Sequence, residues 1–100
     1  MNIEDIKKLD NLQLANYISR NEELLLNKDI RDLLMQEEKH YAFVWIVQKI
    51  DDCSYISDDD MVDRILNDKR RSEKLNAIIT SCKDVSKFVK NENVIKAILS

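Results

Sequence analysis

The sequence predicts an all-α protein: a compact bundle of six to eight helices, with one long central helix and a C-terminal stack of short helices. The chain of 100 residues contains neither glycine nor proline, so it lacks the residues that tight β-hairpin turns normally require. Leu, Lys and Glu, which lose little conformational freedom in a helix, are abundant. Apolar residues also recur three and four positions apart along most of the chain, which places them on one face of a helix.

Helix starts are expected at Asn, Asp and Ser, whose side chains accept hydrogen bonds from the exposed amides of a first helical turn. Ser57 and Ser81 are each followed three residues later by an aspartate, which resembles a capping box, and Asn21 and Asn91 precede acidic residues. The expected helices span residues 3–9, 11–20, 22–26, 28–50, 58–66, 70–80, 83–90 and 92–99. The polar residues 36–39 mark a place where the longest of them can break.

One apolar pattern recurs along the chain: an apolar residue followed, after two intervening positions, by an apolar pair. Its last copies begin at Leu75, Val85 and Ile95, ten residues apart. A helix of about eight residues is not stable alone in water, so we expect these copies to stack side by side. The chain stops at Ser100, where the next copy would begin. The sequence therefore predicts a single all-helical domain over residues 1–100, and it suggests that this domain is the N-terminal part of a longer chain.

The C-terminal segment "LNAIITSCKDVSKFVKNENVIKAILS", residues 75–100, resembles the tandem short-helix repeats of some bacteriophage tail-fibre and other virion proteins. It departs from that outline in carrying Lys83, Lys87, Lys90 and Lys96 where the family usually has small residues. The resemblance implies a structural protein of phage or mobile-element origin. A likeness to helix-pair solenoids of the armadillo and HEAT type is weaker, because their repeats are about four times longer than ten residues.

The charge balance argues against nucleic acid as a partner. The net charge is −3 with both signs interspersed, whereas binding to a phosphate backbone normally needs a basic excess. A small DNA-binding regulator would depend on Arg70 and Arg71, which form only a short basic run. The start of the chain lacks the pattern of a signal peptide, and the longest apolar run, residues 41–47, is too short for a membrane helix. We expect a cytoplasmic location in a host cell, or a place in a virion.

The sequence indicates no enzyme, no cofactor and no metal site. Phosphate loops and calcium loops both need glycine, which the chain lacks. Cys53 and Cys82 have no metal-ligand spacing, and His40 is the only histidine. The two cysteines could pair, but reduced, partly buried thiols are the preferred interpretation.

Two sets of residues are candidates for binding a protein partner. Tyr41 and Trp45 lie four positions apart and share a helical face, although an apolar helix of this kind is more often central in a bundle. Asp58, Asp59 and Asp60 form an acidic run that resembles, in charge, the phosphates of DNA. The first set supports a non-enzymatic interaction or structural module, which binds a second copy or a host protein. The second set supports the alternative, a small acidic inhibitor of a host nucleic-acid-binding or defence enzyme, similar in strategy to anti-CRISPR proteins.

Overall fold

The computed structural model describes residues 1–51 and 53–99, and within them it contains helices and connecting turns but no strand. The all-α prediction is therefore confirmed. The α-helices are α1 (Ile3–Lys7), α2 (Asn11–Ser19), α3 (Lys28–Leu34), α4 (His40–Lys49), α5 (Asp59–Leu66), α6 (Arg71–Ser81), α7 (Ser86–Val89) and α8 (Glu92–Leu99). Three short 3-10 helices complete them: η1 (Glu22–Leu26), η2 (Glu37–Lys39) and η3 (Ser54–Ile56). None of these helices is long and apolar enough to cross a membrane.

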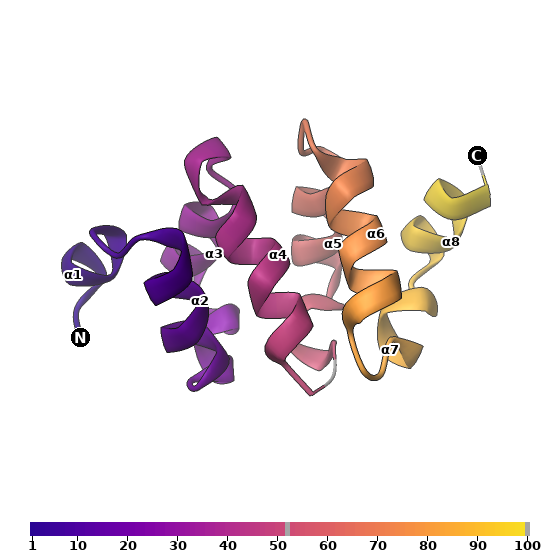
Figure 1. Ribbon diagram of the computed structural model, residues 1–100. Coiled ribbons are helices and arrows are strands. Elements are labelled where there is room, and N and C mark those ends of the chain that lie inside the picture. Colours follow the sequence, from indigo (N-terminus) through magenta and orange to yellow (C-terminus); the bar gives the residue numbers. More distant parts are fainter. Residues whose placement is uncertain (52, 100) are drawn as a thin grey trace.

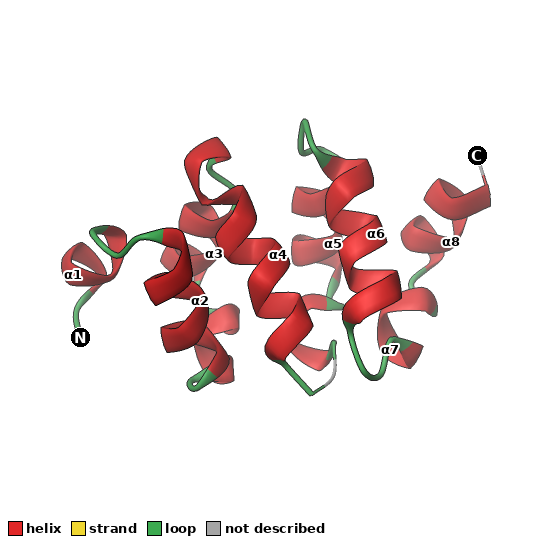
Figure 2. Ribbon diagram, in the orientation of Figure 1, coloured by secondary structure: helices red, strands yellow, loops and turns green. Residues whose placement is uncertain are grey.

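The helices form an elongated array with extents of 39 × 25 × 19 Å. Figure 1 shows α2, α4 and α6 side by side in one row, with α3 and α5 behind them and α8 at the C-terminal end. The same succession of helices and loops can be followed in Figure 2. The chain between residues 11 and 99 forms three successive repeats: α2-η1-α3, α4-η3-α5 and α6-α7-α8. Each repeat consists of a first helix, a short helical turn and a second helix.

Equivalent positions of the three repeats supply one continuous core. The first helices begin at residues 11, 40 and 71, the connecting turns at 22, 54 and 86, and the second helices at 28, 59 and 92. The period is therefore about thirty residues, in the range typical of helical repeat proteins. Ile18, Val47 and Ile78 are buried at the same position of the three first helices. Buried residues at the same or an adjacent position are Leu25, Ile56 and Phe88 in the connecting turns, and Ile30, Val62 and Val94 in the second helices.

The array differs from the sequence-based expectation in two respects. The helix expected over residues 28–50 is not continuous: it is divided into α3 and α4 at the polar residues 36–39, where the sequence indicated that it can break. The ten-residue interval of the C-terminal segment is not the structural period, because its three copies lie on three different elements, α6, α7 and α8. The expected stack of short C-terminal helices is nevertheless present, and α4 lies centrally between α2 and α6.

Side-chain caps explain where several of the α-helices begin. Asp10 forms a capping box with Gln13, and Asn27 accepts hydrogen bonds from two amides at the start of α3. The expected cap at Ser57 is wrong by one residue, because the Asp58 side chain accepts from the first turn of α5. The expected start at Ser81 is wrong, since this residue ends α6.

The two other expected starts are placed as follows. Asn91 accepts a hydrogen bond from the Asn93 amide at the start of α8, as expected. Asn21 precedes η1 but makes no capping bond. Its side-chain amide instead donates to the carbonyl oxygen of Tyr17.

Candidate functional site

The predicted acidic run lies at the contact between the first and second repeats, where Arg31 binds it. The Arg31 side chain is 6% exposed, and its guanidinium donates to both carboxylate oxygens of Asp58, at 2.7 and 2.8 Å, and to Asp60 at 3.0 Å. It also donates to the carbonyl oxygens of Leu25, at 2.6 Å, and of Tyr55, at 3.0 Å. These five bonds engage every donor that a guanidinium possesses. Arg31 therefore joins α3 and η1 to η3 and α5.

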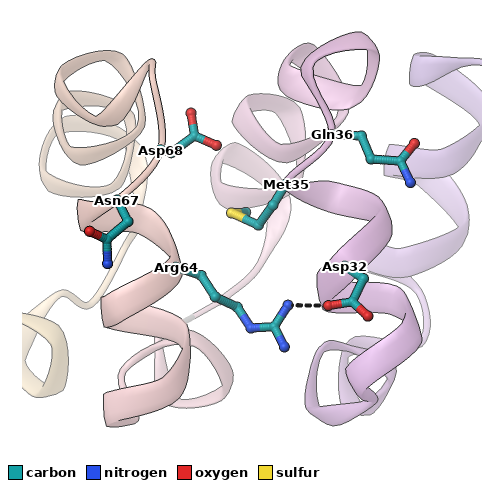
Figure 3. A pocket seen from close by; sticks show the side chains of 6 residues that line it. All are labelled: Asp32, Met35, Gln36, Arg64, Asn67 and Asp68. Atoms are coloured by element: carbon teal, nitrogen blue, oxygen red, sulfur yellow. Dashed lines mark hydrogen bonds and ion pairs between the residues drawn. The ribbon is translucent and has the colours of Figure 1, made fainter.

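The ion pairs continue across the surface of α3 and α5. Arg64 donates to Asp60 at 3.1 Å and to Asp32 at 2.5 Å. Figure 3 shows Arg64 reaching from α5 toward Asp32 on α3 across a hollow that is also lined by Met35 and Asp68. The hollow is thus closed on one side by an internal ion pair.

These contacts change the electrostatic character of the acidic run. The hydrogen bond from Arg31 holds the pKa of the Asp58 carboxyl below its ordinary value of 3.8, although partial burial opposes the shift. Asp60 is held ionised in the same way, because its hydrogen bond with Arg31 lowers its pKa. Asp59 accepts a hydrogen bond from the side-chain amide of Asn91 at 3.0 Å. Each of the three aspartates has an intramolecular partner, so the arrangement lends no support to a role in charge mimicry.

Tyr41 and Trp45 lie together on the exposed side of α4, as their spacing predicted. Their ring centroids are 6.1 Å apart, and the Arg70 guanidinium lies 5.9 Å from the centre of the Tyr41 ring. Arg70 is itself fixed by an ion pair with Glu37 at 2.7 Å. Tyr41 is 53% exposed, whereas Trp45 is partly buried against the core. Tyr41 is therefore an accessible aromatic ring with neighbours on more than one side.

A surface groove begins beside Tyr41 and runs between the first helices of the second and third repeats. From α4 it is lined by His40, Tyr41, Val44 and Gln48, and from α6 by Glu73, Asn76, Ala77, Thr80 and Ser81. Its walls combine an aromatic ring and short apolar side chains with amide and hydroxyl groups. We call this surface the α4–α6 groove. Such a mixture suits a protein segment that presents both apolar and polar side chains.

A buried polar cluster lies at the contact between the second and third repeats. The Lys74 side chain is 1% exposed, and its ammonium group lies 2.9 Å from an oxygen of Asp68 and 3.0 Å from Nδ1 of His40. Nε2 of His40 lies 2.9 Å from a carboxylate oxygen of Glu73. Since the lysine ammonium can only donate, Nδ1 of His40 accepts and Nε2 carries the proton.

Asp68 is ionised in this cluster. Burial raises the pKa of its carboxyl, but the hydrogen bonds from Lys74 and the Arg70 amide outweigh burial and lower it below its ordinary value. Lys74 thus does for the second and third repeats what Arg31 does for the first and second: a buried cation joins neighbouring repeats.

Sequence reasoning missed Arg31, His40 and Lys74, because isolated charged or polar residues are normally assigned to the surface. A signal for Lys74 was available in the repeat. Counting from the start of each first helix, Lys74 occupies the position of Leu14 and Phe43, both of which are fully buried. A charge at a repeated apolar position predicts a buried, partnered ion.

The two cysteines lie close together although they are far apart in sequence. Cys53 precedes η3, Cys82 follows α6, and their sulfur atoms lie 2.6 Å apart. Within residues 1–51 and 53–99, no three His, Cys, Asp or Glu side chains are grouped so as to hold a metal ion.

Comparisons of the chain with protein-family models, with curated proteins and with solved structures find no match. The resemblance of residues 75–100 to phage tail-fibre repeats therefore stays a prediction.

Proposed function

We propose that the protein is a non-enzymatic interaction module that binds another protein through the α4–α6 groove, with Tyr41 as its main anchor. The observation that carries this proposal is the position of Tyr41: half exposed, in contact with Trp45 and Arg70, and at the end of a groove. Large aromatic residues dominate binding energies at protein interfaces. A ring that is already held by neighbours loses less conformational freedom on binding than a free one.

The repeat architecture supports the same proposal. Arrays of helical repeats present extended surfaces that bind other proteins, and the groove lies between two adjacent first helices of such an array. The conspicuous buried charges, Arg31 and Lys74, are both bound by intramolecular partners that join repeats. These intramolecular contacts suit a structural role, and they account for the two buried charges without a bound substrate.

Site-specific photo-crosslinking tests the proposed surface. A photoreactive amino acid is placed at position 41 and, as a matched control, at Leu26, which is 58% exposed but lies on η1 outside the groove. In cells that produce the protein, position 41 is expected to form a discrete adduct that position 26 does not form. The same adducts from both positions, or none from position 41, would overturn the proposal.

The partner can be a second copy or a different protein, and the C-terminal end of the array is the surface suited to a second copy. Ile95, Ile98 and Leu99 on α8 are 41%, 50% and 81% exposed. Ile98 occupies the repeat position of Leu34, which is fully buried in the core. At the opposite end, α1 covers the array and exposes charged side chains.

Light scattering over a concentration series, at low and high salt, distinguishes binding of a second copy from binding of a different protein. A dimer that persists in high salt and is lost in Ile98→Lys would identify a second copy on the α8 surface. A monomer at all concentrations would exclude self-association and direct the search to a host protein.

A phage or mobile-element origin is part of the proposal and rests on the resemblance of residues 75–100 alone. Immunoblotting of purified virions and of infected-cell extract tests it. A fixed copy number in the virion would support a structural component, and restriction to the extract would support a cytoplasmic interaction module. Absence from both would contradict the phage assignment.

A further inference from the structure

The cysteine pair is placed where two repeats meet. Cys53 lies in the connection between α4 and α5 of the second repeat, and Cys82 lies directly after α6 of the third. Their sulfur atoms are 2.6 Å apart although the residues are 29 positions apart in sequence. The backbone amide of Cys53 also donates to the carbonyl oxygen of Asp84 at 3.2 Å. The two segments are therefore already held together by the main chain.

We propose that Cys53 and Cys82 form a reversible intramolecular disulfide that locks the third repeat to the second. Two cysteines can be bridged without moving the backbone only when their side chains already approach each other, and this condition is met. The two cysteines belong to adjacent repeats. The disulfide would therefore add a covalent connection to an interface that is otherwise held by non-covalent contacts.

The oxidant is a small disulfide of the glutathione type. The thiolate of Cys82, which is 8% exposed compared with 1% for Cys53, attacks one sulfur of the small disulfide and releases one glutathione thiolate. The thiolate of Cys53 then attacks the Cys82 sulfur of the mixed disulfide and releases the second. Two protons from the protein thiols pass to the two released thiolates, so the protein is oxidised by two electrons and the small disulfide is reduced by two.

A surface hollow borders Cys53, the thiol that completes the bond. It is lined by Cys53, Ser54, Asp84, Ser86 and Lys87. The Lys87 ammonium lies 3.1 Å from the Ser54 hydroxyl, which places a positive charge beside the residue adjacent to Cys53.

Equilibration of the full chain with mixtures of reduced and oxidised glutathione tests the proposal. In the oxidising mixture the monomer is expected to lose about 2 Da, and peptide mapping is expected to join Cys53 to Cys82. Its melting temperature should rise on the order of 10 °C, because the bond closes a long loop in the unfolded chain. Adding dithiothreitol should reverse both changes in the wild-type protein, so the test does not depend on a variant that folds.

Cys53→Ser and Cys82→Ser provide the controls, and neither should show the rise in melting temperature. Thiols that persist in the oxidising mixture, adducts that stop at the mixed disulfide, or disulfide-linked dimers would each overturn the proposal. An intramolecular bond that lowers the melting temperature would overturn the proposed locking of the two repeats.

Discussion

Replacing Lys74 with methionine tests whether the buried cation stabilises the contact between the second and third repeats. Methionine keeps a long apolar stem but removes the ammonium group, which leaves Asp68 and Nδ1 of His40 without that partner. Breaking a buried pair by removing one member costs about 3–5 kcal/mol. Asp68 retains its hydrogen bond from the Arg70 amide, and its side chain is 10% exposed. We therefore expect a loss near the lower end, about 3 kcal/mol of unfolding free energy.

Urea unfolding followed by the fluorescence of Trp45, the single tryptophan, measures this loss. With a denaturant slope near the lower end of the usual range for small proteins, the midpoint should fall by about 2 M. Lys96→Met, at an exposed position of α8, is the matched control and should change the free energy by less than about 0.5 kcal/mol.

A second variant separates an uncompensated charge from lost packing. Lys74→Met combined with Asp68→Asn removes the carboxylate that has lost its partner, and it should recover more than about 1 kcal/mol of the loss. A loss below about 1 kcal/mol in Lys74→Met, or no recovery in the double variant, would show that the cluster does not stabilise the contact as described.

Three further predictions concern the ion pair between the first two repeats and the helix caps. Asp58→Asn weakens the bidentate contact with Arg31 and should lower the unfolding free energy measured in urea by about 2 kcal/mol. Asp59→Asn, on the neighbouring exposed residue, should lower it by less than about 0.5 kcal/mol. Equal losses in the two variants would refute a stabilising ion pair between Arg31 and Asp58. Because the pKa of Asp58 is lowered in the folded state, its contribution is complete above the unfolded pKa and is lost as the pH falls through the folded value. The wild-type urea midpoint should accordingly fall as the pH is lowered below the ordinary carboxyl value of 3.8, and Asp58→Asn should show a smaller fall. Asn27→Ala removes a cap that accepts two amide hydrogen bonds and should cost about 1 kcal/mol, while Gln36→Ala, whose side chain makes no capping bond, should be nearly neutral in the same assay.

The sequence predicted the helices better than it predicted their arrangement. The short turn at Glu22–Leu26 and the last helix at Glu92–Leu99 were placed correctly, because acidic first turns and apolar periodicity are local signals. The period of about thirty residues was missed because first helices, connecting turns and second helices all carry the same short apolar pattern. The pattern that begins at Leu75, Val85 and Ile95 predicts one repeated helix, but its copies lie on three distinct elements of one repeat.

In the candidate site, too, the sequence predicted contacts between residues close in sequence and did not predict contacts between distant ones. The shared face of Tyr41 and Trp45 follows from helical spacing and is confirmed by their ring contact. The partners of Asp58 and Asp60 could not be predicted, because Arg31 lies almost thirty residues away in sequence and reaches them only when the repeats stack. Long-range ion pairs of this kind leave no local pattern.

The most direct test of the proposed function is the affinity of the partner captured at position 41 for the wild type, Tyr41→Ala and Leu26→Ala. Isothermal titration is expected to show a loss of at least about 30-fold for Tyr41→Ala, the effect of an anchor residue. Leu26→Ala should bind within about two-fold of the wild type. Wild-type affinity in a Tyr41→Ala protein that keeps its urea midpoint would contradict the proposal that the α4–α6 groove is the binding surface.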